Sequence, residues 1–182
     1  QTALTGTYNN LTISTTGGAT ASGDITVNGV LNLAGANASA TKGCLEMVTN
    51  YNNYPRTNTS NQYAALSSYT LTMGSNATTI GQGDVTGKIY RNSLLANTVY
   101  TFGNQYTSYA FTVAPTDVTV FVTIGTAYGD GATWGNTSAV QRSYEMIPTG
   151  GAGGRVSMNL HYLESELNGN SESLLTTGDF DI

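Results

Sequence analysis

The sequence predicts an all-β protein, and alternation, frequent turns and composition carry that prediction. Apolar and polar residues alternate with a period of two at 109–113, 118–124 and 156–162, and more weakly at 25–31. Such alternation is typical of strands with one buried and one solvated face. Short Gly- and Asn-containing segments separate these runs. We expect a mainly antiparallel, jelly-roll-like β-sandwich, with a short β-solenoid as the alternative.

Composition favours an ordered β protein over a disordered chain. Thr, Gly, Asn and Ser make up nearly half of the residues, and only 9% are charged. Disordered segments contain few aromatic and β-branched residues, whereas this chain has 12 Tyr and 4 Phe among many Thr, Val and Ile. Those residues fit a pleated, half-buried surface.

Two local patterns refine the expected architecture. Asn28-Gly29, between Val27 and Val30, predicts a β-hairpin because Asn-Gly accepts the positive φ angles of a type I′ turn. A second pattern, LTI at 11–13 followed by GDIT at 23–26, recurs with the same spacing as LTM at 71–73 and GDVT at 83–86. If this echo is structural, it indicates two similar β units or two turns of a solenoid.

The length fits a single β domain over residues 1–182. Residues 1–18 are set apart as a possible N-terminal extension, because a Thr-rich apolar strand here is followed by Gly17-Gly18. This segment is either an ordinary first strand or a strand donated to a neighbouring copy of the chain. The residues that would be donated are Leu4, Tyr8, Leu11 and Ile13.

Charge argues against nucleic-acid and membrane partners. The net charge is −5, and no cluster of Lys and Arg offers a site for phosphates or an anionic membrane surface. No apolar run is long enough to insert into a membrane. The chain begins Gln1-Thr2-Ala3, as a mature N-terminus left by signal removal would. We expect a secreted, extracellular or cell-surface protein.

The sequence contains no recognisable catalytic set, so we expect no enzyme activity, no cofactor and no metal site. His161 and Cys44 are the only His and Cys, and they are far apart. His161 is expected on a sheet surface and Cys44 in the core. Glu164 and Glu166 are interpreted as surface charges, because glycosidase carboxylates face each other across a cleft.

Two further features bear on a surface role. Trp134 lies in a predicted loop, where an exposed ring could stack on a sugar, although anchoring that loop to the core is the simpler role. Sequons for N-glycosylation are also present. The five acceptor residues are Asn10, Asn37, Asn58, Asn76 and Asn136.

Several motifs resemble the β-strand-repeat cell-surface and extracellular proteins of Bacteroidota and related bacteria. The first is YNNLTI at 8–13, followed by GDITVNGVLNL at 23–33. Further motifs that resemble these proteins are GDVTG at 83–87, YTFGN at 100–104 and the more distinctive HYLESELNGN at 161–170. The resemblance implies export and a role in adhesion or in a sheath or fibre, and it implies no catalytic residues.

We therefore expect an extracellular structural protein that self-assembles, as a filament or sheath subunit. Assembly would use β-strand edges or the donated N-terminal strand, and the partner would be the chain itself. The alternative is a carbohydrate-binding or adhesin module that uses Trp134.

Overall fold

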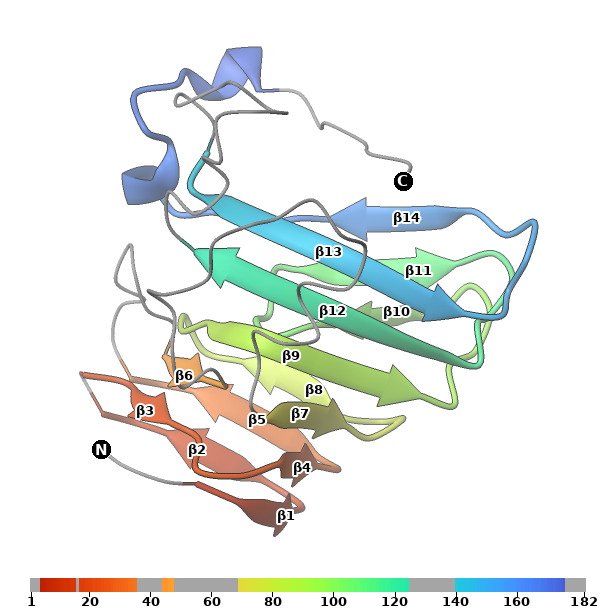
Figure 1. Cartoon of the computed structure of the whole chain (residues 1–182), viewed down its shortest axis with the longest axis horizontal. Helices are drawn as coiled ribbons and strands as arrows, with labels where there is room; N and C mark the ends of the chain where they lie inside the picture. The colour runs from red at the N-terminus through yellow and green to blue at the C-terminus, as the bar shows by residue number, and fades with distance from the viewer. Residues whose placement is uncertain (1–3, 16, 36–43, 48–68, 125–139, 176–182) are drawn as a thin grey trace, which may run out of the picture.

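β-strands dominate the computed structural model, which describes residues 4–15, 17–35, 44–47, 69–124 and 140–175 (Figure 1). The helices in these ranges are two short 3-10 turns, η3 (Glu164–Glu166) and η4 (Glu172–Leu174). Neither is long or apolar enough to span a bilayer. The all-β class expected from the sequence is confirmed.

The first half of the chain pairs in parallel, which differs from the mainly antiparallel sheet that we expected. From β1 to β8, successive strands pass around three ladders, so that every third strand returns to the same ladder, and the longer strand β9 joins two of these ladders. The ladders are β1-β4-β7-β9, β2-β5-β8 and β3-β6-β9. The strands of this parallel half (residues 4–92) are β1 (Gly6–Tyr8), β2 (Leu11–Ile13), β3 (Ala19–Thr20), β4 (Ile25–Val27), β5 (Val30–Leu33), β6 (Leu45–Glu46), β7 (Thr70–Met73), β8 (Thr78–Ile80) and β9 (Val85–Asn92).

Alternation predicted the inward residues of these strands but could not predict their direction. Ile25 lies beside Leu71, and Leu71 beside Ile89, and all three are completely buried. The same alternation would bury them in an antiparallel sheet, because every strand has a side-chain period of two. Parallel pairing follows from the path between strands, which period-two alternation does not encode.

The hairpin predicted at Asn28-Gly29 is wrong, because β4 and β5 belong to different ladders. The two residues instead form a corner that stacks on the preceding one: Asn28 N–H donates to Tyr8 O (2.9 Å) and Gly29 N–H donates to Asn9 O (2.6 Å). A Cβ at Gly29 would lie 2.6 Å from Asn9 O. Only glycine fits this close backbone approach.

The sequence echo is not a structural repeat. Leu11 lies in β2, whereas its counterpart Leu71 lies in β7, and these strands belong to different ladders. True neighbours are Leu11 and Leu31, and Ile25 and Leu71. The chain from β4 to β7 is longer than the chain from β1 to β4, because residues 48–68 fall within it.

Pairing becomes antiparallel after β9. That strand pairs with β12, and β12 with β13, while β10, β11 and β14 form a separate three-stranded sheet. In Figure 1 this sheet lies behind β12 and β13. The strands of this antiparallel half are β10 (Val99–Thr101), β11 (Ser108–Phe111), β12 (Asp117–Ile124), β13 (Arg142–Thr149) and β14 (Val156–Asn159).

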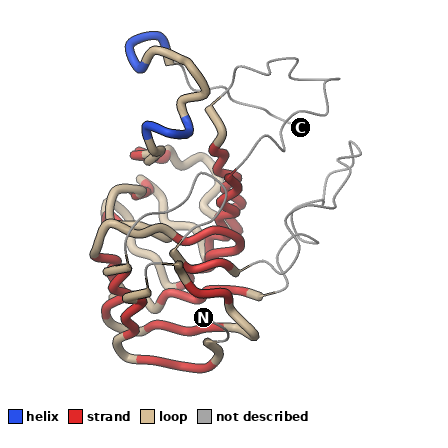
Figure 2. Tube along the Cα trace, turned by 90° about the vertical axis from the view of Figure 1, so that its left-hand side faces the viewer, coloured by secondary structure: helices blue, strands red, loops and turns tan. Residues whose placement is uncertain are grey.

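One buried apolar cluster extends through both halves, from Leu11 in β2 to Val122 in β12. The sandwich as a description of the whole chain is not confirmed. Over the described residues the sheets form neither a closed barrel nor a solenoid, since pairing changes direction at β9. Figure 2 shows strands filling the lower part of the molecule and both 3-10 helices at the opposite end.

The apolar rows of the antiparallel half are buried to different extents. Val118, Val120 and Val122 in β12 are at most 1% exposed, as expected for a strand with neighbours on both sides. In β14, Met158 is 48% exposed although alternation predicts a buried position. The difference arises because β14 is the last strand of its sheet among the described residues.

Arg91 is fully buried where the two halves meet, and its guanidinium donates hydrogen bonds to three backbone carbonyl oxygens. Nε donates to Thr101 O (2.9 Å), Nη1 to Gly74 O (2.9 Å) and Nη2 to Ala77 O (2.6 Å). The guanidinium carbon also lies 5.5 Å from the ring centres of Tyr100 and Phe102. Burial lowers the pKa of Arg91 to about 10, so the group stays charged at pH 7. Arg91 therefore joins the turn at Gly74 to β10.

We predict that Arg91→Met lowers the free energy of unfolding by about 3 kcal/mol, because buried carbonyl oxygens lose their donors. Urea denaturation followed by circular dichroism measures the change. Arg155→Met is the matched control, since Arg155 is exposed and its loss should change stability by at most about 0.5 kcal/mol. Equal stability of the Arg91 and Arg155 variants would contradict this role.

Candidate functional site

The N-terminal segment pairs within its own chain in this structure. β1 lies beside β4 and β2 beside β5. Leu11 and Ile13 are buried at 6% and 3% exposure, and Leu4 and Tyr8 pack against the same core with part of their surface exposed. These four candidate donor residues therefore serve as ordinary core residues of their own domain here.

The first strands nevertheless leave one end of the parallel half open. β1, β2 and β3 each have a single strand neighbour among the described residues. Gly6 N–H donates to Asp24 O, and Tyr8 O accepts from Asn28 N–H, so the backbone groups of Thr7 point away from β4. Ile13 O likewise accepts from Gly35 N–H, which directs the backbone groups of Thr12 away from β5. Such edges can accept another strand.

The described chain includes only part of the predicted glycan and sugar sites. Asn10 and Asn76 are exposed. The Asn10 side chain also has a structural role, because its Oδ1 accepts a hydrogen bond from Val30 N–H (2.8 Å). Asn37, Asn58, Asn136 and Trp134 lie outside the described residues.

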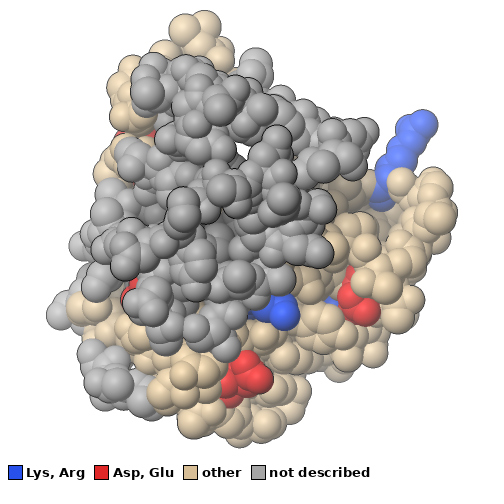
Figure 3. All heavy atoms as spheres, viewed as in Figure 1, with Lys and Arg blue, Asp and Glu red and all other residues tan. Residues whose placement is uncertain are grey.

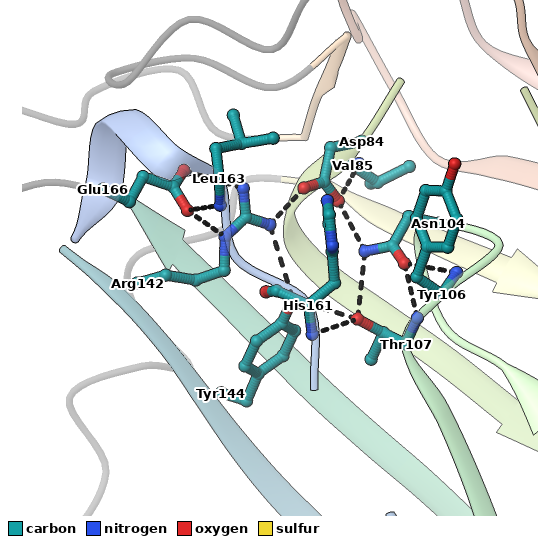
Figure 4. A network of polar contacts seen from close by, with 10 residues as sticks. All are labelled: Asp84, Val85, Asn104, Tyr106, Thr107, Arg142, Tyr144, His161, Leu163 and Glu166. Atoms are coloured by element: carbon teal, nitrogen blue, oxygen red, sulfur yellow. Dashed lines mark hydrogen bonds and ion pairs between the residues drawn. The ribbon is translucent and has the colours of Figure 1, made fainter. Parts of the chain in front are cut away.

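Among the described residues, a buried polar network is centred on Arg142 at the start of β13 (Figure 4). Its guanidinium lies between two carboxylates and is nearly inaccessible, with the side chain 1% exposed. Nη1 donates to Asp84 Oδ2 on one side. On the other, Nε and Nη2 donate to the two carboxylate oxygens of Glu166 at 2.7 and 2.8 Å. Two parallel hydrogen bonds of this kind fix both the distance and the orientation of the pair.

Asp84 connects this ion pair to the loop between β10 and β11. Its Oδ1 accepts hydrogen bonds from Val85 N–H (3.0 Å) and from Asn104 Nδ2 (2.9 Å). Asn104 also donates to the Thr107 hydroxyl oxygen (3.0 Å). Asp84, Asn104 and Thr107 are all buried, so the network satisfies polar groups that water does not reach.

Tyr144 and Thr107 extend the network to the backbone of the C-terminal segment. The Tyr144 hydroxyl donates to His161 O (2.6 Å) and lies 3.0 Å from the Thr107 hydroxyl. His161 N–H donates to Thr107 Oγ1 (3.3 Å). Burial raises the pKa of Tyr144, so this hydroxyl stays protonated and can donate.

Glu166 is buried, which corrects its interpretation as a surface charge. Besides Arg142 it binds the backbone of its own segment: Leu163 N–H donates to Oε2 (2.9 Å). The Glu166 carbonyl also accepts from Gln141 N–H (2.8 Å). Glu164, two residues earlier, is exposed as expected. The 3-10 turn η3 points the two side chains in different directions, whereas a strand would place them on one face.

Electrostatics favour the charged form of Arg142. Burial alone lowers the pKa of Arg142, but the hydrogen bonds to Glu166 and the charge of Asp84 raise it above its ordinary value. The guanidinium is therefore charged throughout the physiological pH range. Removing either partner of such a buried pair leaves an uncompensated charge and is strongly destabilising.

His161 is half-buried and packs against Tyr106, with ring centres 4.8 Å apart and ring planes tilted by 37°. Burial lowers the pKa of His161, although the charge of Asp84 opposes the shift. The imidazole is therefore neutral at pH 7. This position partly fits the sheet-surface role expected for it, because the ring packs at the surface while the backbone enters the network.

The arrangement can fasten one segment to another. Its carboxylates bind a guanidinium and backbone N–H groups, and its hydroxyls bind each other and a backbone carbonyl. Within the described ranges, no group of three or more His, Cys, Asp and Glu side chains could hold a metal ion. Cys44 is buried, as expected, and its thiol donates to Gly35 O. Burial raises the pKa of Cys44 and keeps the thiol protonated.

Sequence reasoning missed the central residues of this network, Asp84 and Arg142. A usable signal was present for Arg142: it shares strand parity with Tyr144 and Met146, which pack against the core. In a chain with so few charges, an arginine in register with a buried row indicates a buried ion pair. Its acidic partners could not be predicted because they come from distant segments.

We predict that Glu166→Gln loosens the C-terminal segment, because the amide cannot replace a carboxylate that accepts two bonds from Arg142. Amide hydrogen exchange over residues 160–170 should accelerate on the order of tenfold or more. Glu164→Gln is the matched control, since Glu164 is exposed, and should leave exchange unchanged. The interpretation fails if both variants exchange like the parent.

Comparison with known proteins gives no relative: no family model, no curated protein and no solved structure matches the chain.

Proposed function

We propose that this chain is an extracellular or cell-surface structural protein that self-assembles through β-strand edges, as a filament or sheath subunit. The observation that carries the proposal is the open end of the parallel half, where β1, β2 and β3 each have one described neighbour. A second copy could extend any of these ladders through main-chain hydrogen bonds.

The sequence of this end supports association. Natural proteins protect sheet edges with charged residues, proline or a covering element. β1, β2 and β3 contain Gly-Thr-Tyr, Leu-Thr-Ile and Ala-Thr, with neither charge nor proline. The outward backbone groups of Thr7 and Thr12 can therefore meet another strand without repulsion.

The surface offers little long-range repulsion between copies. Charged residues are rare, and on the face in Figure 3 the visible acidic and basic side chains of the described residues are scattered. A weakly charged surface permits close lateral contact, since few like charges oppose it. An extracellular subunit with one cysteine would have to be stable without an internal disulfide. Here, hydrogen bonds from the buried Arg91 and Arg142 cross-link its elements.

Edge addition is a better mechanism than donation of residues 1–18. To donate this segment, the chain would withdraw Leu11 and Ile13 from its own core and uncover Leu31 and Leu33. Each buried side chain of this size contributes about 2 kcal/mol. Adding a strand to β2 breaks none of these contacts.

We infer that the two sheets of the antiparallel half face each other as two layers. Tyr109 and Phe111 from one sheet share a core with Val118 and Val120 from the other. We interpret this half as a sandwich-like body that holds the open end rigid.

We predict that Thr12→Pro blocks assembly while preserving the fold. Proline removes the outward N–H of Thr12 and puts its ring where an added strand would pair, and edge strands tolerate proline. Negative-stain microscopy and sedimentation should show filaments or large assemblies for the parent chain and dispersed particles for the variant.

Thr12→Val is the matched control, because it keeps the N–H and the β-branched shape, and it should assemble like the parent. Thermal unfolding by circular dichroism checks that the proline variant is folded. Assembly by a folded Thr12→Pro chain would rule out the β2 edge, and a parent chain that stays dispersed would overturn the proposed function.

A further inference from the structure

We propose that the outer edge of β14 is a second interface, at which two copies of the chain pair antiparallel about a two-fold axis. In this arrangement Met158 faces Met158 of the second copy. The inference is independent of the proposed function, because it concerns the opposite end of the molecule from β1, β2 and β3 (Figure 1).

Backbone geometry leaves this edge open. Among the described strands β14 pairs with β11 alone. Thr112 N–H donates to Arg155 O (2.9 Å), so Arg155 and, by alternation, Ser157 and Asn159 direct their backbone groups toward β11. The backbone groups of Val156 and Met158 therefore point out of the sheet and can pair with another strand.

Side chains beside this edge are apolar and incompletely covered. Met158 lies opposite Tyr109 across the ladder and on the same face, yet Tyr109 is 1% exposed and Met158 48%. Leu160, the next residue of the same row, is 38% exposed. The apolar side chains on the inward face of the sheet are thus buried at β11 but partly exposed to solvent at β14. A further strand would extend that face and shield both side chains from water.

The charge pattern identifies a second copy as the occupant. Two-fold pairing places each residue opposite a residue of the same short segment, and like charges directly opposite are destabilising. Residues 156–160 (VSMNL) contain no charge and no proline. The edge strand β13 differs, since it contains Glu145 and Pro148. β14 thus lacks the features that prevent self-pairing.

Register follows from the outward positions. For Val156, Met158 and Leu160 all to pair, Val156 must face Leu160 of the second copy, and Met158 must lie on the axis. Arg155 then faces His161, which is neutral at pH 7, and no arginine faces another. The two three-stranded sheets join into one six-stranded sheet. Because this short strand alone is a small interface, we expect association in the micromolar range.

Charge substitutions at Met158 test the axis directly. Assembly at β2 would hide a dimer, so the dimer is measured in the full chain that carries Thr12→Pro. Sedimentation velocity of this chain at low ionic strength should show a concentration-dependent dimer. Met158→Lys and Met158→Glu should each weaken it at least tenfold, because like charges then meet on the axis. An equimolar mixture of the two variants should dimerise again, since opposite charges meet.

Ser157→Lys is the matched control. Residue 157 lies on the other face of the strand and opposes the uncharged Asn159, so this variant should dimerise like the Thr12→Pro chain with Ser157 unchanged. A Thr12→Pro chain that is monomeric at its highest soluble concentration overturns the inference. So does a dimer that both Met158 variants retain, or a mixture that stays monomeric. Because every chain in this comparison carries Thr12→Pro, the dimer is measured separately from assembly at β2.

Discussion

The two halves of the molecule depend on β9, the strand that both share. Its first residues pair in parallel with β6, and its later residues pair with β7 on one side and β12 on the other. Val85 and Ile89 are completely buried in the common core. Both polar networks also start here, since Asp84 immediately precedes the strand and Arg91 lies near its end. The change from parallel to antiparallel pairing therefore occurs within one packed unit.

The placement of the few charged residues bears on both the core and the proposed surface role. The chain has few charged residues, yet Asp84, Arg91, Arg142 and Glu166 are all buried. In the interior, these four residues form two networks, each centred on one guanidinium. Each network joins segments that are distant in sequence. Outside, the remaining charges are too few to oppose contact between copies. The chain thus has few charges at its surface, where they would oppose association, and several in its interior, where they cross-link segments.

The sequence predicted residue placement better than connectivity. Alternation identified Val118 and Val120 as inward, and Cys44 was expected in the core, because burial depends on local pattern. Parallel pairing was not predictable, since period-two alternation is the same for either direction. Asn28-Gly29 suits a corner as well as a hairpin, and only the neighbouring turn decides between them. Burial of Glu166 depends on Arg142 across the fold, which no local pattern of its own segment shows.

Native-state hydrogen exchange of an Ile89→Ala chain tests most directly whether β9 makes the two halves one cooperative unit. Ile89 is fully buried, and its truncation should cost about 3 kcal/mol. The account predicts that the most protected amides of β5 and β11, neither of which pairs with β9, lose the same free energy of opening. Loss of protection in one of these strands with the other unchanged would contradict it.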